Sequence, residues 1–248
     1  MSARTPNTAP GTARAQRFSV GAVISKTWKT FRAAPGLYIT VSLIATLPAM
    51  ALEILLPPTF QLRSDVVYVF STLLSCAFEG AATYAACRSL SGSRAGVAEC
   101  IEKGMKRYPS LAGLGLIMTL VLLAGNKLYV LPGLLALPFV AAAIPACVVE
   151  NIGVWASLRR SFFLVKGCYA KIFGLIALYF AVMTMFLVFG ILLSPSFLLG
   201  KDVESTLFIH LIYILPNALW LVMFSVMYIQ LRSVKEGVTI RKLVDVFA

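Results

Sequence analysis

The sequence has few charged residues and almost no histidine. Charged residues occupy 13% of its 248 positions, and 59% of the positions are hydrophobic. An ordinary soluble domain carries about 25% charged residues, so this composition excludes that class and indicates an integral membrane protein. The single histidine and five cysteines without a Cys-x-x-Cys pair provide no recurring ligand spacing. We therefore expect reduced thiols, no metal site and no other cofactor.

Motifs of known enzymes and of nucleic-acid-binding modules are also missing. The sequence contains no nucleophile elbow, phosphate-binding loop, His-Glu-x-x-His motif or paired-carboxylate hydrolase site. Its net charge of +12 would suggest nucleic acid in a soluble protein, but no RNP-like, zinc-finger or helix-turn-helix pattern accompanies the charge. In a membrane protein, the positive-inside rule and attraction to anionic lipid account for that surplus. We expect a non-enzymatic protein without a nucleic-acid partner.

Six apolar segments approach the roughly 20 residues that a bilayer-spanning helix needs. The third and fourth are the shortest, divided by a Gly-Asn-Lys turn at 125–127, and Pro132, Pro138 and Pro145 are expected to kink the fourth. The predicted fold is therefore an all-α, polytopic integral membrane protein with six transmembrane helices. The predicted spans are about Leu37–Leu56, Val66–Leu90, the two parts of Pro109–Val149, Ile172–Leu193 and Thr206–Leu231.

A basic, amphipathic segment precedes each pair of spans. The clearest copy is Val154–Lys166, and weaker copies start at Val20 and Val97. Aligning the three starts brings apolar residues into register four and eight positions later. These residues are Ile24, Ile101 and Leu158, and then Trp28, Met105 and Phe162. Apolar residues at i, i+4, i+8 and i+11 form one stripe along a helix, which indicates a helix lying on the bilayer surface.

The basic residues of these segments are predicted to contact lipid headgroups, because they lie opposite or beside the apolar stripe. They are Lys26, Lys29, Arg32, Lys103, Lys106, Arg107, Arg159, Arg160 and Lys166.

Three units follow from this alignment, each an amphipathic helix and a hairpin of two spans. They cover about 18–90, 95–150 and 152–232 within a single membrane domain at 16–248, whose tail is 232–248. Residues 1–15 are rich in Thr, Ala and Pro and are predicted to be disordered. Because the first apolar stretch starts only near Leu37, we expect no cleavable signal peptide and a retained first span.

The distribution of Lys and Arg predicts the orientation. Nineteen of the 22 lie in the N-terminal segment, the C-terminal tail and the two loops that carry the later amphipathic segments. The alternate loops carry one each, namely Arg63, Lys127 and Lys201. By the positive-inside rule, both termini and all three amphipathic helices are expected in the cytoplasm. The predicted location is the cytoplasmic (inner) membrane of a bacterium.

Glu79 and Asn217 are the polar residues predicted to lie deepest in the membrane. A carboxylate near the middle of a span costs about 2–3 kcal/mol or more unless it is neutral or partnered, so Glu79 is a candidate functional residue. It could relay protons or cations or hold a ligand headgroup. The alternative is a protonated glutamate that is hydrogen-bonded to a neighbouring helix, and Asn217 in the sixth span is the expected partner. Glu53 and His210 are expected nearer the outer interface.

Three segments resemble a known family. They are FSVGAVISKTWKTFRAAPGL before the first span, PACVVENIGVWASLRRSFFLVKG after the fourth, and MYIQLRSVKEG at the end of the sixth. Together they resemble bacterial six-span proteins related to the membrane domain of glycerophosphoryl diester phosphodiesterases. The resemblance implies a module concerned with lipids or the cell envelope. The matching positions are Glu150, Arg159, Arg160, Ser161, Lys166, Gly167, Arg232 and Gly237.

The hydrolase of the fused family members is a separate soluble domain with a metal-dependent carboxylate and histidine site. One histidine cannot provide such a site, so the resemblance does not extend to phosphodiesterase activity. Glu150 is expected to pair with Arg159 or Arg160 across a short loop.

Three functions stay open at this point. The first is a non-enzymatic membrane module that binds anionic lipid, a partner membrane protein or a second copy of itself through its basic helices. The second is a transporter or lipid-translocating protein with a midplane polar site around Glu79 and Asn217. The third is a membrane-embedded enzyme acting on lipid, which would need polar residues clustered at one interface. A water-filled cavity reaching Glu79 would favour the second function, and dry packing around Glu79 would not.

Overall fold

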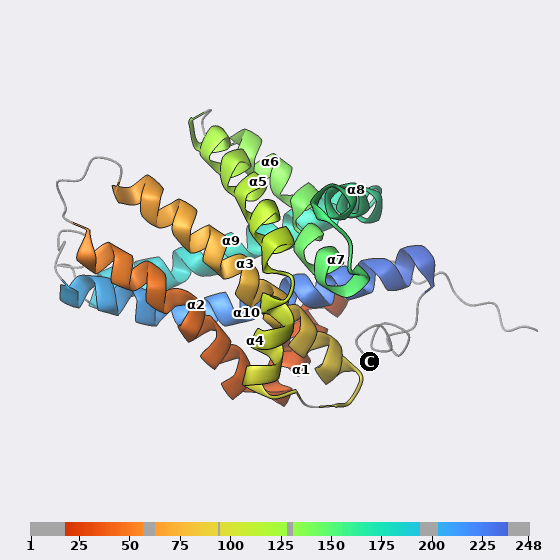
Figure 1. The fold of residues 1–248 in the computed structure, drawn as a ribbon, viewed down its shortest axis with the longest axis horizontal. Coiled ribbons are helices and arrows are strands. Elements are labelled where there is room, and N and C mark those ends of the chain that lie inside the picture. Colours follow the sequence, from red (N-terminus) through yellow and green to blue (C-terminus); the bar gives the residue numbers. More distant parts are fainter. Residues whose placement is uncertain (1–17, 57–62, 94, 128–130, 194–202, 238–248) are drawn as a thin grey trace, which may run out of the picture.

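The computed structural model describes residues 18–56, 63–93, 95–127, 131–193 and 203–237, without the side chains of 63–65, 124–127 and 131–132. These residues form ten helices and no strand (Figure 1). The helices are α1 Val20–Ala33, α2 Pro35–Leu55, α3 Arg63–Leu90, α4 Val97–Met105, α5 Tyr108–Lys127, α6 Leu131–Val140, α7 Ala143–Glu150, α8 Val154–Val165, α9 Tyr169–Leu193 and α10 Val203–Glu236. The predicted disordered segment 1–15 and most of the predicted tail 232–248 lie outside the described residues.

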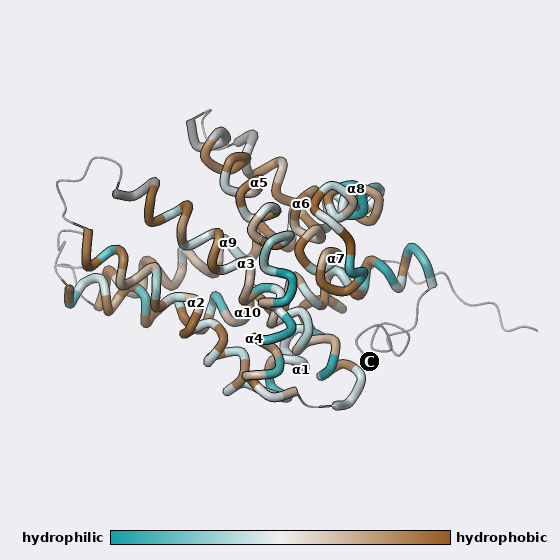
Figure 2. The backbone as a smooth tube through the Cα atoms, in the orientation of Figure 1, coloured by the Kyte–Doolittle hydropathy of each residue, from teal (hydrophilic) through white to brown (hydrophobic). Residues whose placement is uncertain are grey.

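Among the described residues, five helical segments are long and apolar enough to cross a membrane. They are Pro35–Leu55, Val66–Leu90, Gly133–Glu150, Tyr169–Leu193 and Val203–Glu236. A sixth is obtained if α4 and the described part of α5, which meet at a bend of 75°, are counted as one span. Figure 2 shows brown, apolar residues along the long helices and teal, polar residues on α4, on α8 and near the end of α10. The prediction of an all-helical, multi-pass membrane protein is confirmed.

The fourth predicted span is broken in the middle. Helix α6 ends at Val140, and α7 begins at Ala143 after a two-residue turn. Pro145 lies in the first turn of α7, where it needs no amide hydrogen, but its ring would clash with the carbonyl four residues earlier in a continuous helix. The break lies where that clash would occur. Residues 143–149 are all buried, which makes α7 the most enclosed helix of the described chain.

The long helices pack in a closed order. Helix α2 packs against α3, α3 against α5, α5 against α6, α6 against α9, α9 against α10, and α10 against α2 again. Helix α7 contacts both α3 and α10, and these two helices of the ring also contact each other. The closure brings segments from opposite ends of the chain together. Ser42 of α2 donates a hydrogen bond to the carbonyl of Ile214 in α10 (2.9 Å).

Each of the three short helices, α1, α4 and α8, packs mainly on one other helix. Helix α4 packs mainly on α3, α8 mainly on α7, and α1 mainly on α10 (Figure 1). In the first two cases the partner precedes the short helix in the chain, whereas α10 lies at the other end of the sequence. Lys171, at the start of α9, donates a further hydrogen bond to the carbonyl of Phe18 just before α1 (2.9 Å). Each short helix therefore packs against the second long segment of a helix pair other than the pair that follows it in the chain.

Aligned positions of the short helices have matching environments. Three positions after the aligned starts, Val23, Cys100 and Ser157 are fully buried. Four positions further along each helix, the small residues Thr27, Gly104 and Ser161 are also buried. One position further, Trp28, Met105 and Phe162 are 52%, 48% and 51% exposed. The packing face is therefore rotated away from the predicted apolar stripe, and part of that stripe faces outward.

Candidate functional site

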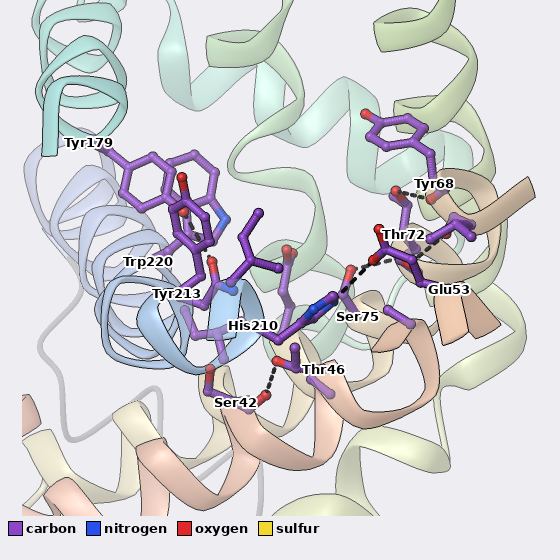
Figure 3. Close-up of a pocket in the computed structure, with 18 residues that line it drawn as sticks. Ser42, Thr46, Glu53, Tyr68, Thr72, Ser75, Tyr179, His210, Tyr213 and Trp220 are labelled. Atoms are coloured by element: carbon purple, nitrogen blue, oxygen red, sulfur yellow. Dashed lines mark hydrogen bonds and ion pairs between the residues drawn. The ribbon is translucent and has the colours of Figure 1, made fainter. Parts of the chain in front are cut away.

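A cavity of about 440 Å³ opens among α2, α3 and α10, with one wall completed by Tyr179 of α9 (Figure 3). Glu79, near the middle of membrane-length α3, and Asn217 of α10 both line it. The two residues predicted to lie deepest in the membrane thus face a common cavity. The structure has no hydrogen bond between the described Asn217 and Glu79 side chains, and the amide oxygen of Asn217 accepts one from the Tyr179 hydroxyl (3.3 Å).

Five serine and threonine side chains on two helices line the cavity: Ser42, Thr46, Ser71, Thr72 and Ser75. Each of them donates its proton to a backbone carbonyl. Ser42 donates to α10, and the other four donate to the preceding turn of their own helix. A hydroxyl that has donated its only proton retains acceptor lone pairs. These five groups can therefore offer the cavity only hydrogen-bond acceptors.

Glu53 of α2 and His210 of α10 face each other in the cavity lining (Figure 3). Nδ1 of His210 lies 2.9 Å from the carbonyl oxygen of Thr206, which can only accept, so Nδ1 carries a proton. Nε2 lies 3.7 Å from Oε2 of Glu53. The pair is therefore an ion pair only when both ring nitrogens are protonated.

An aromatic wall faces the hydroxyl groups. The ring centroids of Tyr179 and Trp220 are 3.9 Å apart, and Trp220 lies at the same distance from Phe224. Tyr213 lies beside Tyr179 and Trp220 in Figure 3 and also lines the cavity. The cavity thus combines apolar ring faces with polar oxygen atoms.

The charged groups at the cavity are acidic. Among the described residues, the lining includes two glutamates and one histidine but neither Lys nor Arg. The described part of the chain also contains no cluster of three or more His, Cys, Asp or Glu side chains able to hold a metal ion.

A second polar cluster joins α7, α8 and α10. Arg160 Nε donates to Glu150 Oε1 (2.8 Å), and Arg160 also pairs with Glu236. Arg232 Nε lies 3.0 Å from Glu236 Oε2 and 3.6 Å from Glu150 Oε1. The Tyr228 hydroxyl donates a further hydrogen bond to Glu150 (2.7 Å). We call these five residues the ion-pair cluster; its two positive and two negative charges balance.

The ion-pair cluster is largely shielded from solvent. The side chains of Arg160 and Glu150 are 22% and 17% exposed. Burial alone lowers the pKa of Arg160, but its hydrogen bonds to the Glu150 and Glu236 carboxylates and their negative charges outweigh burial and raise that pKa above its ordinary value. Of the two expected partners for Glu150, the structure pairs Arg160, whereas Arg159 is exposed. Arg160, also predicted to contact lipid headgroups, is thus engaged by carboxylates.

Compared with known proteins, the chain matches no family model, no curated protein and no solved structure. The resemblance to the phosphodiesterase-related family therefore stays a prediction based on its motifs.

The structure brings part of that motif set together. Glu150, Arg160 and Arg232 meet in the ion-pair cluster, while Ser161 is buried nearby in α8 without a hydrogen-bond partner among the described residues. Gly167 and Gly237 have φ angles of +86° and +64°, a conformation that favours glycine. The backbone conformation alone therefore explains why glycine occupies these two positions, without a role in ligand binding.

The remaining predicted headgroup contacts lie on the short helices or just after them. Five are exposed and three are half-buried, and Lys106 forms an ion pair with Glu102 (2.7 Å). The exposed ones are Lys29, Arg32, Lys106, Arg159 and Lys166, and the half-buried ones are Lys26, Lys103 and Arg107.

Sequence reasoning missed the hydroxyl lining of the cavity and two members of the ion-pair cluster. The hydroxyls at 42 and 46, and those at 71, 72 and 75, recur three to four residues apart in apolar helices, which places each set on one helix face. Glu236 lies four residues after Arg232, a spacing at which helical side chains meet. Tyr228 had no distinguishing signal, because it reaches Glu150 from a distant part of the chain.

Proposed function

We propose that this protein binds a polar ligand in an intramembrane cavity and moves it across the bilayer, as a transporter or lipid-translocating protein. One observation carries the proposal. The cavity of about 440 Å³ lies among membrane-length helices and contains the Glu79 carboxyl.

The energetics of the bilayer support this reading. A polar group in the hydrocarbon region is costly unless it has a partner, and such groups characteristically line ligand or ion pathways. The cavity is lined by two carboxyl groups, an amide, five serine and threonine hydroxyls and three tyrosines. A helix bundle that served only as an anchor would be more stable with apolar packing at these positions.

The cavity and the ion-pair cluster lie at different heights along α10, which suits a transporter that is open on one side of the membrane. Asn217 at the cavity and Arg232 in the ion-pair cluster are fifteen residues apart on α10, or about 22 Å at 1.5 Å per residue. With both termini in the cytoplasm, as the charge distribution predicts, the cavity faces the outer side and the ion-pair cluster closes the inner side. The closed packing order supports three units, each an amphipathic helix with two spans, around this core.

Lipid movement in proteoliposomes tests the proposal. Phosphatidylethanolamine and phosphatidylglycerol, each with a fluorescent acyl chain, serve as probes, and dithionite bleaches only the outer leaflet. We expect the native chain to accelerate exchange of at least one probe and Glu79→Gln to abolish most of that acceleration. Glu204→Gln removes an exposed carboxylate from the same helix as Asn217 without touching the cavity, and should behave like the native chain. Exchange equal to that in protein-free vesicles would contradict the proposal.

A second candidate function, binding of anionic lipid by the basic helices, is favoured by the outward-facing Trp28, Met105 and Phe162. Apolar side chains exposed beside lysines suit the boundary between headgroups and acyl chains. Juxtamembrane cations contribute about 1 kcal/mol each toward anionic lipid.

Exposed cations test this second function better than Arg160, which is already paired with two carboxylates. Replacing Lys29, Arg32 and Arg159 together with Gln should reduce the anionic lipid that the protein retains in native mass spectrometry. The matched control replaces the three cations predicted on the opposite side, Arg63, Lys127 and Lys201. Equal lipid retention by both triple variants would refute headgroup binding by the short helices.

A further inference from the structure

We propose that the cavity binds an organic ammonium cation, with Glu79 as its counter-ion and the Tyr179–Trp220 pair as its aromatic wall. The inference rests on the proposed function and names the class of its ligand. Three independent features of the cavity support it: the sign of its charges, the direction of its hydrogen bonds and its aromatic surface.

The charges favour a cation. Glu53 and Glu79 line the cavity, and among the described residues neither Lys nor Arg does. Among the described lining residues, His210, which faces Glu53, is the one side chain that can carry positive charge. In a low-dielectric environment a carboxylate strongly prefers a positive partner, and an anionic ligand would be repelled.

The hydrogen-bond directions favour a ligand that donates or carries positive charge. The five lining hydroxyls have given their protons to backbone carbonyls, so they turn oxygen lone pairs toward the cavity. An ammonium group, which has no lone pairs, makes favourable contacts with such oxygens. At these five positions a phosphate or carboxylate would face acceptors that cannot donate to it.

The aromatic wall distinguishes an organic cation from a metal ion. The faces of Tyr and Trp rings attract ammonium groups through their quadrupole. Tyr179 and Trp220 are held in place by each other, and the Tyr179 hydroxyl is fixed by Asn217. Small inorganic cations prefer a full shell of oxygen ligands, and aromatic faces cannot supply one.

The size of the cavity suits a small organic ligand. Its volume of about 440 Å³ lies within the roughly 300–1,000 Å³ that is usual for small-molecule sites. Two sources of the same chemistry fit: a free ammonium compound, or the amine headgroup of a lipid.

Fluorescence of Trp220 provides a direct binding assay. The chain has three tryptophans, and replacing Trp28 and Trp155, which do not line the cavity, with Phe leaves Trp220 as the reporter. The full chain is placed in nanodiscs of phosphatidylglycerol, which contain no amine. Choline is titrated against 3,3-dimethylbutan-1-ol, its uncharged counterpart of nearly the same shape.

We expect a saturable fluorescence change with choline and at least about tenfold weaker binding of the alcohol. A tenfold difference corresponds to about 1.4 kcal/mol. Glu79→Gln should weaken choline binding at least tenfold, Glu79→Asp should weaken it less because the charge is kept, and Glu204→Gln should leave it unchanged. The Asp variant also separates loss of charge from loss of folding.

A second pair of nanodiscs distinguishes the two ligand sources. Adding phosphatidylethanolamine should weaken choline binding if a lipid headgroup enters the cavity, and should leave it unchanged if a free ammonium compound does. Equal binding of choline and the alcohol, or no binding of either, would overturn the ammonium assignment. The lipid-exchange assay would remain an independent test of the proposed function, because it detects lipid movement without identifying the ligand of the cavity.

Discussion

Gly104 tests how closely α4 lies against α3. A Cβ atom built at this position would lie 2.7 Å from the carbonyl oxygen of Ala77 and 2.9 Å from the amide nitrogen of Ala81. Both are backbone atoms of α3 and cannot move aside as a flexible side chain would. Thr27 and Ser161, which are also buried, occupy the equivalent positions of the other two short helices.

The magnitude follows from two opposing effects. Exchanging Gly for Ala in a helix gains about 1 kcal/mol of helix propensity, less near a helix end. Overpacking typically costs about 1–3 kcal/mol, and contact with backbone on two sides places Gly104→Ala toward the upper end of that range. We expect this variant to lower the free energy of unfolding by about 1–2 kcal/mol.

Gly174→Ala is the matched control. Gly174 lies inside α9 with no atom within 4 Å of a built Cβ, so here only the propensity gain acts and stability should be unchanged or slightly higher. Both variants can be compared by SDS titration in mixed micelles, followed by tryptophan fluorescence. If Gly104→Ala proves as stable as Gly174→Ala, the close α3–α4 contact is wrong.

Two further predictions concern the polar contacts. Glu150→Gln removes the carboxylate that Arg160, Arg232 and Tyr228 share, and should cost about 3 kcal/mol in the same titration, because a broken buried pair leaves charge unpaired. Arg159→Gln, the exposed neighbour, should change stability by under about 0.5 kcal/mol, and equal effects would refute the ion-pair cluster. The hydrogen bond that the Tyr84 hydroxyl donates to Glu99 lowers the pKa of the Glu99 carboxyl in the folded protein. This hydrogen bond therefore stabilises the fold at pH values above the pKa of Glu99 in the unfolded chain, and the stabilisation is lost as the pH falls through the folded-state pKa. Tyr84→Phe should raise the Glu99 pKa in a carboxyl carbon NMR titration, and an unchanged pKa would contradict the contact.

The helices were predictable because their signals are local. The apolar run ending at Leu90 gives the end of α3, and the amphipathic pattern before Lys166 gives α8 within two residues. Pro145 was predicted to kink the fourth span, and the structure interrupts the helix just before it with a two-residue turn, while Gly133–Glu150 remains one membrane-length segment. The depth of Glu79 also follows from its place in an apolar run.

The site was less predictable because its contacts join distant segments. The ring closes through contacts such as Ser42 to Ile214, which no local pattern specifies. Likewise, the apolar stripe of α1 predicts an amphipathic helix but not that Thr27 would pack inward while Trp28 stays exposed. Which polar residues share a cavity depends on these packing choices, so Glu79 and Asn217 could be nominated while the hydroxyl and aromatic walls could not.

Water access to the cavity tests the central claim most directly. In a chain whose five cysteines are replaced with Ala, Ser75→Cys places a thiol in the cavity and Leu178→Cys places one on the exposed apolar face of α9. A charged, membrane-impermeant thiol reagent is added to sealed vesicles from each side in turn. We predict reaction of the Ser75→Cys variant from one side only and no reaction of the Leu178→Cys variant. A thiol at position 75 that reacts from neither side, in protein that is folded, would contradict a water-filled cavity at Glu79.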